Sequence, residues 1–319
     1  MRKIKVFALT KGKTGFTILH MKRDIFQSIT QDRIMILDGA TGSGLIAAGM
    51  PARGCTEQWV CEHTDVLVNL QKQYLEAGSQ VIYAATFGAN RVRLASHGLA
   101  DEIERFNTVP VQLARQIATE RQHIVAGDIS MTTMMADFSD EEDFKEVVDV
   151  YKEQIGYLVK AGSEILVVET MINLDEARAA VTAAREVCDL PVMATMTFEA
   201  NGFTLYGDTP EKAAKVLQEA GADAVGANCS TGPDKMLPVI EKMADAVSLP
   251  IVAKPNAWIP QPGPNGTVKY DMSADEFAVS MTRLIEAGAC LVGGCCGTTP
   301  DYIQKLEFLV QNMSFESRR

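Results

Sequence analysis

The sequence lacks an apolar run of about 18 residues, the length that a membrane-spanning helix needs, and it is short of positive charge. Lysine and arginine total 30, against 41 aspartate and glutamate residues, which gives a formal net charge of -11. We therefore expect no membrane segment. Proteins that bind nucleic acids carry basic surfaces for the phosphates, so we expect no nucleic-acid partner either.

A secretory leader is also missing. The first twenty residues are basic, but their apolar stretch VFAL, residues 6–9, is too short for the core of a signal peptide. Seven cysteines without an export signal indicate metal binding or catalysis more often than disulfides. We predict a cytoplasmic protein, in which residues 1–30 form an N-terminal extension with a loosely held beginning and residues 31–319 form a single domain.

Apolar residues are abundant and follow a repeating pattern. They make up 47% of the sequence. Eight short apolar runs alternate with polar loops and with stretches of amphipathic, helical periodicity. The runs cover residues 34–40, 80–87, 123–130, 164–171, 191–198, 223–230, 250–256 and 290–297.

Eight strand-helix units predict an α/β fold, a closed (β/α)8 TIM barrel. Related phrases such as LEAGSQVIY and VKAGSEILV precede the even-numbered strands, and their glycines are expected to end the preceding helices: Gly78, Gly162, Gly221 and Gly288. An open doubly wound sheet is the alternative, but eight units match the strand number of the barrel. We expect the loop IPQPGPNG, residues 259–266, to lie over a site.

Polar residues at the predicted strand ends identify the candidate site, because active sites of this fold lie at the C-terminal ends of its strands. Asp38, Glu169 and Cys229 end the first, fourth and sixth strands, and Cys295 and Cys296 end the eighth. Three thiolates are strong ligands for zinc and leave the fourth tetrahedral position free. We predict one zinc ion per chain, held by these three cysteines.

The alternative for the three cysteines is that they are buried thiols in a glycine-rich turn. Flanking glycines favour the metal site, because they permit the backbone angles needed to present two adjacent sulfurs to one ion; they are Gly293, Gly294 and Gly297. The other cysteines lack this context and are predicted to be structural or incidental: Cys55, Cys61, Cys188 and Cys290.

Four blocks of sequence resemble the homocysteine S-methyltransferase family, which includes the homocysteine-binding domain of cobalamin-dependent methionine synthase and betaine-homocysteine methyltransferase. The blocks are DGATGSGL at Asp38, GANCSTGP at Gly226, KPNA at Lys254 and GGCCGTTP at Gly293. The likeness runs from about residue 34 to the end of the eighth strand. It implies a (β/α)8 barrel, with Cys229, Cys295 and Cys296 as the zinc ligands that carry the catalysis.

The same resemblance implies the substrate and its pocket. Asp38 and Glu169 would hold the amino group of homocysteine, and Gly39, Phe87 and Asp128 complete the expected substrate-binding set. Homocysteine would be activated as a zinc thiolate and methylated to methionine, because a thiolate is the nucleophilic form of a thiol.

The methyl donor is less defined. We find no D-x-H-x-x-G stretch of the kind associated with corrinoid-binding domains and no nucleotide-type glycine fingerprint. Methylcobalamin on a separate corrinoid protein is therefore the expected donor, with S-methylmethionine and betaine as alternatives. A corrinoid-system methyltransferase for a different thiol or donor, and a zinc-bearing partner module without turnover of its own, are the competing interpretations.

Three departures from the family pattern fall at the same predicted barrel mouth. Ala85 lies where relatives commonly read TNTF, Ser130 and Met131 lie where they read GDIGP, and Trp258 replaces the glycine after PNA. We expect these changes to reshape the donor side or the carboxylate end of the pocket. For Trp258 the alternatives are loop packing or stacking on a donor or partner.

Overall fold

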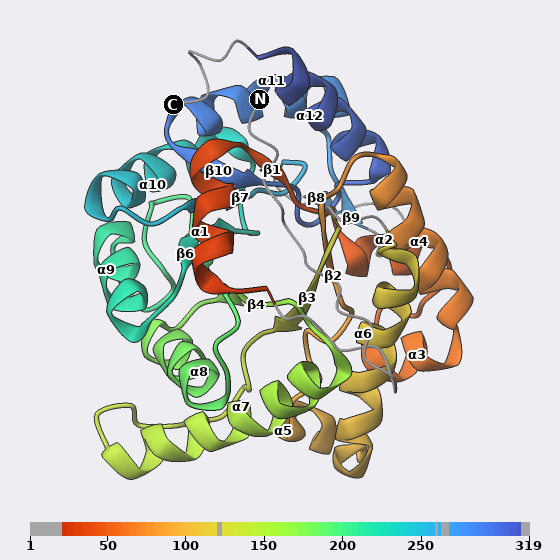
Figure 1. The fold of residues 1–319 in the computed structure, drawn as a ribbon, viewed down its shortest axis with the longest axis vertical. Helices are drawn as coiled ribbons and strands as arrows, with labels where there is room; N and C mark the ends of the chain where they lie inside the picture. Colours follow the sequence, from red (N-terminus) through yellow and green to blue (C-terminus); the bar gives the residue numbers. More distant parts are fainter. Residues whose placement is uncertain (1–20, 120–122, 259–260, 263–267, 314–319) are drawn as a thin grey trace, which may run out of the picture.

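The computed structural model describes residues 21–119, 123–258, 261–262 and 268–313, and it forms a ring of parallel strands surrounded by helices (Figure 1). The strands neighbour one another in the order β1-β10-β7-β6-β5-β4-β3-β2. A parallel bridge between Leu37 and Val81 joins the two ends of this order. The predicted (β/α)8 barrel is therefore confirmed. Its strands are β1 (Met35–Ile36), β2 (Val81–Tyr83), β3 (Ile124–Ile129), β4 (Ile165–Met171), β5 (Val192–Met196), β6 (Ala224–Asn228), β7 (Ile251–Lys254) and β10 (Ala289–Val292).

Helices follow the strands and cover the outside of the ring (Figure 1). After β1 come α2 (Thr41–Ala47), α3 (Thr56–Glu62) and α4 (Thr64–Glu76), and after β2 come α5 (Arg91–Ala95), η1 (Ala100–Glu102) and α6 (Ile103–Ile117). The other strands are followed by one helix each: α7 (Glu141–Ala161), α8 (Leu174–Val187), α9 (Pro210–Ala220), α10 (Pro233–Ala246), α11 (Ala274–Glu286) and α12 (Pro300–Asn312). Each of the four predicted helix-ending glycines has a positive φ of 102° to 108°, a conformation that favours glycine.

The strands are apolar on both sides because each side packs against a different part of the core. One set of their side chains, including Ile82, Leu166 and Val192, packs beneath the outer helices. The alternate set, including Val81 and Val167, fills the interior of the barrel. The interior is therefore a packed core and not a channel, as in other barrels of this type.

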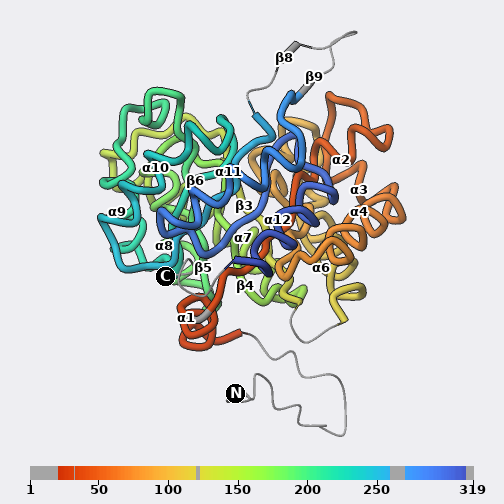
Figure 2. Tube along the Cα trace, turned by 90° about the horizontal axis from the view of Figure 1, so that it is seen from above, coloured from red at the N-terminus to blue at the C-terminus, as the bar shows by residue number. Residues whose placement is uncertain are grey.

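Helix α1 (Arg23–Asp32) closes one end of the barrel. Its Phe26 is fully buried and joins the interior cluster. Figure 2 shows α1 at the end of the molecule opposite the small hairpin of β8 (Gln261–Pro262) and β9 (Val268–Lys269). Strand β8 lies in the loop predicted to cover the site, residues 259–266, and β9 follows that loop. The rest of the loop, like residues 1–20 of the predicted extension, lies outside the described residues. Within the described chain, no helix has the length and apolar character needed to cross a membrane.

Candidate active site

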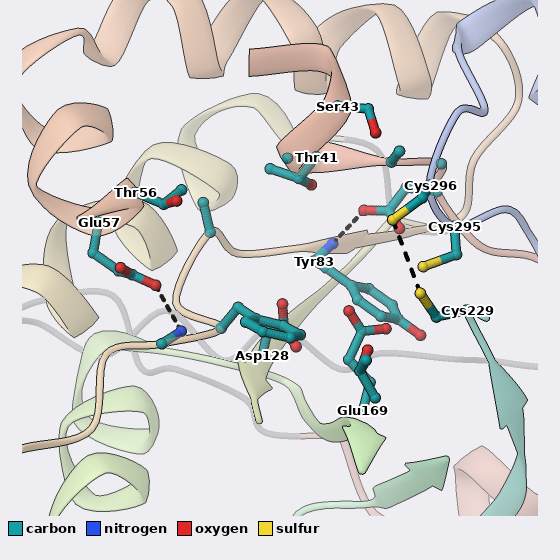
Figure 3. Close-up of a pocket in the computed structure, with 18 of the residues that line it drawn as sticks. Thr41, Ser43, Thr56, Glu57, Tyr83, Asp128, Glu169, Cys229, Cys295 and Cys296 are labelled. Carbon is teal, nitrogen blue, oxygen red and sulfur yellow. Dashed lines mark hydrogen bonds between the residues drawn. The ribbon is translucent and has the colours of Figure 1, made fainter. Parts of the chain in front are cut away.

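A cavity of about 250 Å³ opens at the C-terminal ends of the strands (Figure 3). It contains the candidate residues that the sequence placed at the barrel mouth, although they come from six different strands or the loops after them. All eight predicted site residues line it: Asp38, Gly39, Phe87, Asp128, Glu169, Cys229, Cys295 and Cys296. The fold therefore brings the predicted set together, while their individual roles stay predictions.

Three cysteine sulfurs meet on one side of this cavity. The Sγ atoms of Cys229, Cys295 and Cys296 all lie within 4.8 Å of one another, and those of Cys229 and Cys296 are 3.9 Å apart. Sulfurs bound to one tetrahedral zinc ion at ~2.3 Å lie ~3.8 Å apart. The spacing and the soft donor set therefore fit a zinc ion.

Backbone contacts between neighbouring strand ends hold the sulfurs in place. The amide of Cys229 donates to the carbonyl of Lys254 at 3.1 Å, and the amide of Cys295 donates to the carbonyl of Pro255 at 2.8 Å. Cys229 itself has a φ of 63°, in the left-handed region that non-glycine residues seldom adopt. At Gly294 an added Cβ would lie 2.4 Å from Thr298, so the turn that presents the two adjacent cysteines has no room for a larger residue. This local strain at the cysteines is typical of a functional site.

The sulfur cluster stabilises negative charge on one of its members. Hydrogen bonds from Cys229 and Cys295 lower the pKa of the Cys296 thiol to about 3, against the opposing effect of burial, and a hydrogen bond with Tyr270 adds to the lowering. The thiolate is the form of cysteine that binds metals. The cluster is thus prepared for a cation even before its remaining thiols lose their protons.

A buried ion pair lies beside the sulfurs and was not predicted. The Nζ atom of Lys254 is 2.8 Å from Oδ1 of Asp38 and 3.6 Å from the centre of the Tyr83 ring. The other oxygen of Asp38, Oδ2, accepts a hydrogen bond from the Tyr83 amide at 2.8 Å. Both oxygens of Asp38 are therefore already engaged by the protein. Lys254 and Tyr83 also line the cavity.

Two further acids in the cavity have no ion pair with any described residue. Burial raises the pKa of Glu169 to about 7, with Lys254 opposing and Asp38 adding to the shift. Burial, and then the charge of Glu169, raises the pKa of Asp128 well above its usual range. Oδ1 of Asp128 is buried without a hydrogen-bond partner in the described part of the chain. A cationic group of a ligand would satisfy both carboxylates.

Asn228 connects the acids to the sulfurs. It was not predicted as a site residue, although it belongs to the GANCSTGP block. Its buried Oδ1 accepts hydrogen bonds from the amide of Thr170 and the hydroxyl of Thr195, both at 2.8 Å. Its Nδ2 donates to the Thr170 hydroxyl at 2.7 Å and lies 3.5 Å from Oε2 of Glu169. This side chain fixes the end of β4, and with it the position of Glu169.

The unusual residues at the mouth differ in what they contact. Ala85 lines the cavity, and the Ser130 hydroxyl donates to the backbone carbonyl of Glu169 at 2.9 Å. Met131 packs against the core. Trp258 packs against Gly232, where an added Cβ would be 3.0 Å from its ring, and it is not among the described residues that line the cavity. This contact supports loop packing, while stacking on a donor or partner stays a prediction.

The outer part of the cavity lies away from the sulfurs. Figure 3 shows Glu57 on the side opposite the three cysteines. Oε1 of Glu57 accepts a hydrogen bond from the Gly88 amide at 2.6 Å, and the Arg93 guanidinium is 5.5 Å from the centre of the Phe87 ring. Cys55 lines this outer part, whereas Cys61, Cys188 and Cys290 do not line the cavity.

Comparisons of the sequence and of the structure with known proteins agree on one family. The chain is 31% identical over 313 residues to methionine synthase from Mycobacterium tuberculosis and 31% identical over 300 residues to that from Mycobacterium leprae. These matches cover 93% and 89% of this chain, but the chain spans only about a quarter of each relative, 26% and 25%.

A solved structure with the same fold is the metallated form of the homocysteine methyltransferase MmuM from Escherichia coli. It has a TM-score of 0.72 at 20% identity, and the match covers 88% of this chain and 98% of that one. The family model for homocysteine S-methyltransferase matches residues 35–310. The predicted enzyme class, an S-methyltransferase, is thereby confirmed at the level of the family. Since this match takes in the whole barrel from β1 to α12, with the three-sulfur cluster at its mouth, the chain belongs to the homocysteine S-methyltransferase family.

Proposed function

We propose that this protein methylates the sulfur of homocysteine to give methionine, with a zinc ion held by Cys229, Cys295 and Cys296. One observation carries the proposal: three sulfurs with the spacing of zinc ligands share a cavity with two carboxylates that have no ion pair with a described residue. Such a cavity suits a small molecule that has a thiol at one end and an ammonium group at the other.

The chemistry that a bound zinc ion supplies is a lowered pKa for a substrate thiol, whose ordinary value of ~8.5 leaves it mostly protonated near neutral pH. Cys229, Cys295 and Cys296 would hold the ion at one side of the cavity. Glu169 and Asp128 bind and orient the ammonium group, because neither forms an ion pair with a described residue, while Asp38 holds Lys254. In the reaction the sulfur-methyl bond forms, the donor-methyl bond breaks, and the thiol proton goes to solvent.

The donor in this proposal is a methylcorrinoid carried by a separate protein. The support is the similarity to the two methionine synthases, together with the resemblance to the cobalamin-dependent branch of the family. The cavity is open at the barrel mouth, where a donor carried by another protein could approach the sulfurs. The predicted cytoplasmic location belongs to the same proposal.

The test is a matrix of donors and thiols. Purified protein with its zinc content measured is incubated with methylcobalamin, S-methylmethionine or betaine, each with homocysteine or another thiol, and the methylated product is identified by mass. We expect methionine from homocysteine and methylcobalamin. A different productive pair would support the alternative thiol or donor, and no turnover with any pair at full zinc content would support the partner module.

A further inference from the structure

Lys254 is the buried cation among the described residues that line the inner part of the cavity. The residue is 3% exposed, yet it lines the cavity beside Glu169, Asp128 and the sulfurs. Burying an ammonium group is costly unless it is paired. A charge kept at this position therefore needs an explanation.

The ammonium group of Lys254 has capacity that the protein does not use. It carries three donors. One is directed to Oδ1 of Asp38 at 2.8 Å, and the face of the Tyr83 ring lies 3.6 Å away. No other described oxygen accepts a hydrogen bond from this ammonium group. One donor thus remains for an acceptor inside the cavity.

The charges around the cavity indicate which kind of acceptor the remaining donor of Lys254 would bind. A thiol amino acid brings an ammonium group and a carboxylate on the same carbon. Glu169 and Asp128 supply the negative partners for the ammonium, but they and the cysteines would repel the carboxylate unless a cation were close. Lys254 lines the same cavity as both acids, and its charge lowers the pKa of each, so it can pair with the carboxylate of a ligand whose ammonium group these acids bind.

The other cation of the cavity is in the wrong place for this task. Arg93 lies with Phe87 and Glu57 in the outer part, where both Arg93 and Glu57 approach Gly88. The carboxylate of homocysteine is only a few bonds from its sulfur, and the sulfur would lie at the cysteine cluster. Arg93 therefore provides a matched comparison: a lining cation at the other side of the same cavity.

We propose that Lys254 binds the α-carboxylate of the thiol substrate, held in position by Asp38 and the Tyr83 ring. This inference rests on the proposed function, because it takes the substrate to be a thiol amino acid. It gives Asp38 a positioning role and makes Lys254 the residue that distinguishes an amino acid from a simple aminothiol.

The experiment compares homocysteine with 3-mercaptopropylamine, which is homocysteine without its carboxylate. Dissociation constants of both are measured by calorimetry on zinc-loaded wild-type protein and on the Lys254→Met and Arg93→Met variants, with zinc content and thermal unfolding as checks. A hydrogen bond between charged groups contributes about 1.5–3 kcal/mol, so the wild type should prefer homocysteine roughly 10-fold to 100-fold. Lys254→Met should lose this preference, and Arg93→Met should keep it.

Several results would overturn the inference. Equal affinity of the wild type for the two thiols would do so without any variant, which covers the case that Lys254→Met fails to fold. An equal loss of affinity for both thiols in Lys254→Met would mean that the lysine only holds Asp38, and loss of the preference in Arg93→Met would move the carboxylate to the outer cavity. Because binding is measured without a donor, homocysteine that binds with this preference but is not methylated would contradict the proposed function alone.

Discussion

The barrel has a buried aspartate bound to a basic side chain at each of its two ends, and the two clusters differ in what surrounds them. At the end closed by α1, the fully buried Asp223 binds Arg23 Nε at 2.6 Å, the Val192 amide at 2.9 Å and Arg185 at 3.4 Å. The acid there has a partner for each oxygen, and it joins α1 to the strands.

At the other end, Asp38 also has a partner for each oxygen, the Lys254 ammonium and the Tyr83 amide, but Glu169 and Asp128 lie in the same cavity. These acids have no ion pair with a described residue, and one oxygen of Asp128 has no hydrogen-bond partner there. A buried acid with all its partners stabilises a fold, whereas a surplus of buried acid is costly and is retained where a ligand supplies the missing charge. The closed end therefore has the charge balance of a structural cluster, and the open end has the charge surplus of a ligand site.

The largest expected effect concerns the sulfurs at the open end. Cys296→Ala removes one of the three proposed zinc ligands, the one whose thiol pKa is lowered, so we expect bound zinc to fall well below one ion per chain and methylation to become undetectable. Zinc is measured by elemental analysis and the product by mass. Full zinc content in this variant would contradict the ligand assignment.

The next largest effect is expected when the ion pair at the closed end is broken. Asp223→Ala leaves Arg185 without its acidic partner and should lower the free energy of unfolding by about 3 kcal/mol. The loss is expected because breaking a buried ion pair leaves one charge buried without compensation. Denaturant titration measures this loss. Activity per folded molecule should stay unchanged, and a large loss of activity at full folding would mean that the two ends are coupled.

A smaller effect is expected at the surplus acid of the open end. Glu169→Gln removes the negative charge but keeps the shape, so homocysteine should bind roughly 10-fold to 100-fold more weakly, as for a lost hydrogen bond between charged groups. Zinc should be retained and the free energy of unfolding should not fall, since an unpaired buried carboxylate is replaced by a neutral amide. Calorimetry gives the affinity, and an unchanged value would remove Glu169 from the ammonium site.

The smallest effect is the control for the cysteines. Cys188 is half-buried at the end of α8 and does not line the cavity. Cys188→Ala should change the free energy of unfolding by less than about 1 kcal/mol and leave zinc content and methylation as in the wild type. Loss of zinc equal to that in Cys296→Ala would show that the effect is not specific to the cluster.

The sequence was sufficient to predict the barrel and the gathering of its site residues, since both follow from periodicity and from the rule that strand ends converge. The strands are shorter than the apolar runs: the first run covers residues 34–40, but β1 is Met35–Ile36. The residues after the strand, including Asp38, leave the ladder and turn toward the cavity.

The pairing of Lys254 with Asp38 could not be predicted in the same way. The two residues are 216 positions apart, and only the direction of their side chains decides whether Asp38 faces a ligand or a lysine. Likewise, Phe26 lies in a segment that was predicted only as part of an extension, although α1 is a strongly amphipathic helix. Contacts between distant, individually ordinary residues are what pattern analysis leaves out.

Helix α1 has a consequence for the order of events during turnover. It seals one end of a barrel whose interior is filled with side chains, so in the described part of the chain the cavity opens only at the opposite end. If the donor is the proposed methylcorrinoid on another protein, the thiol has to enter before that donor covers the opening. The methylated product then leaves after the donor has withdrawn, so the proposed reaction has an ordered sequence of binding and release.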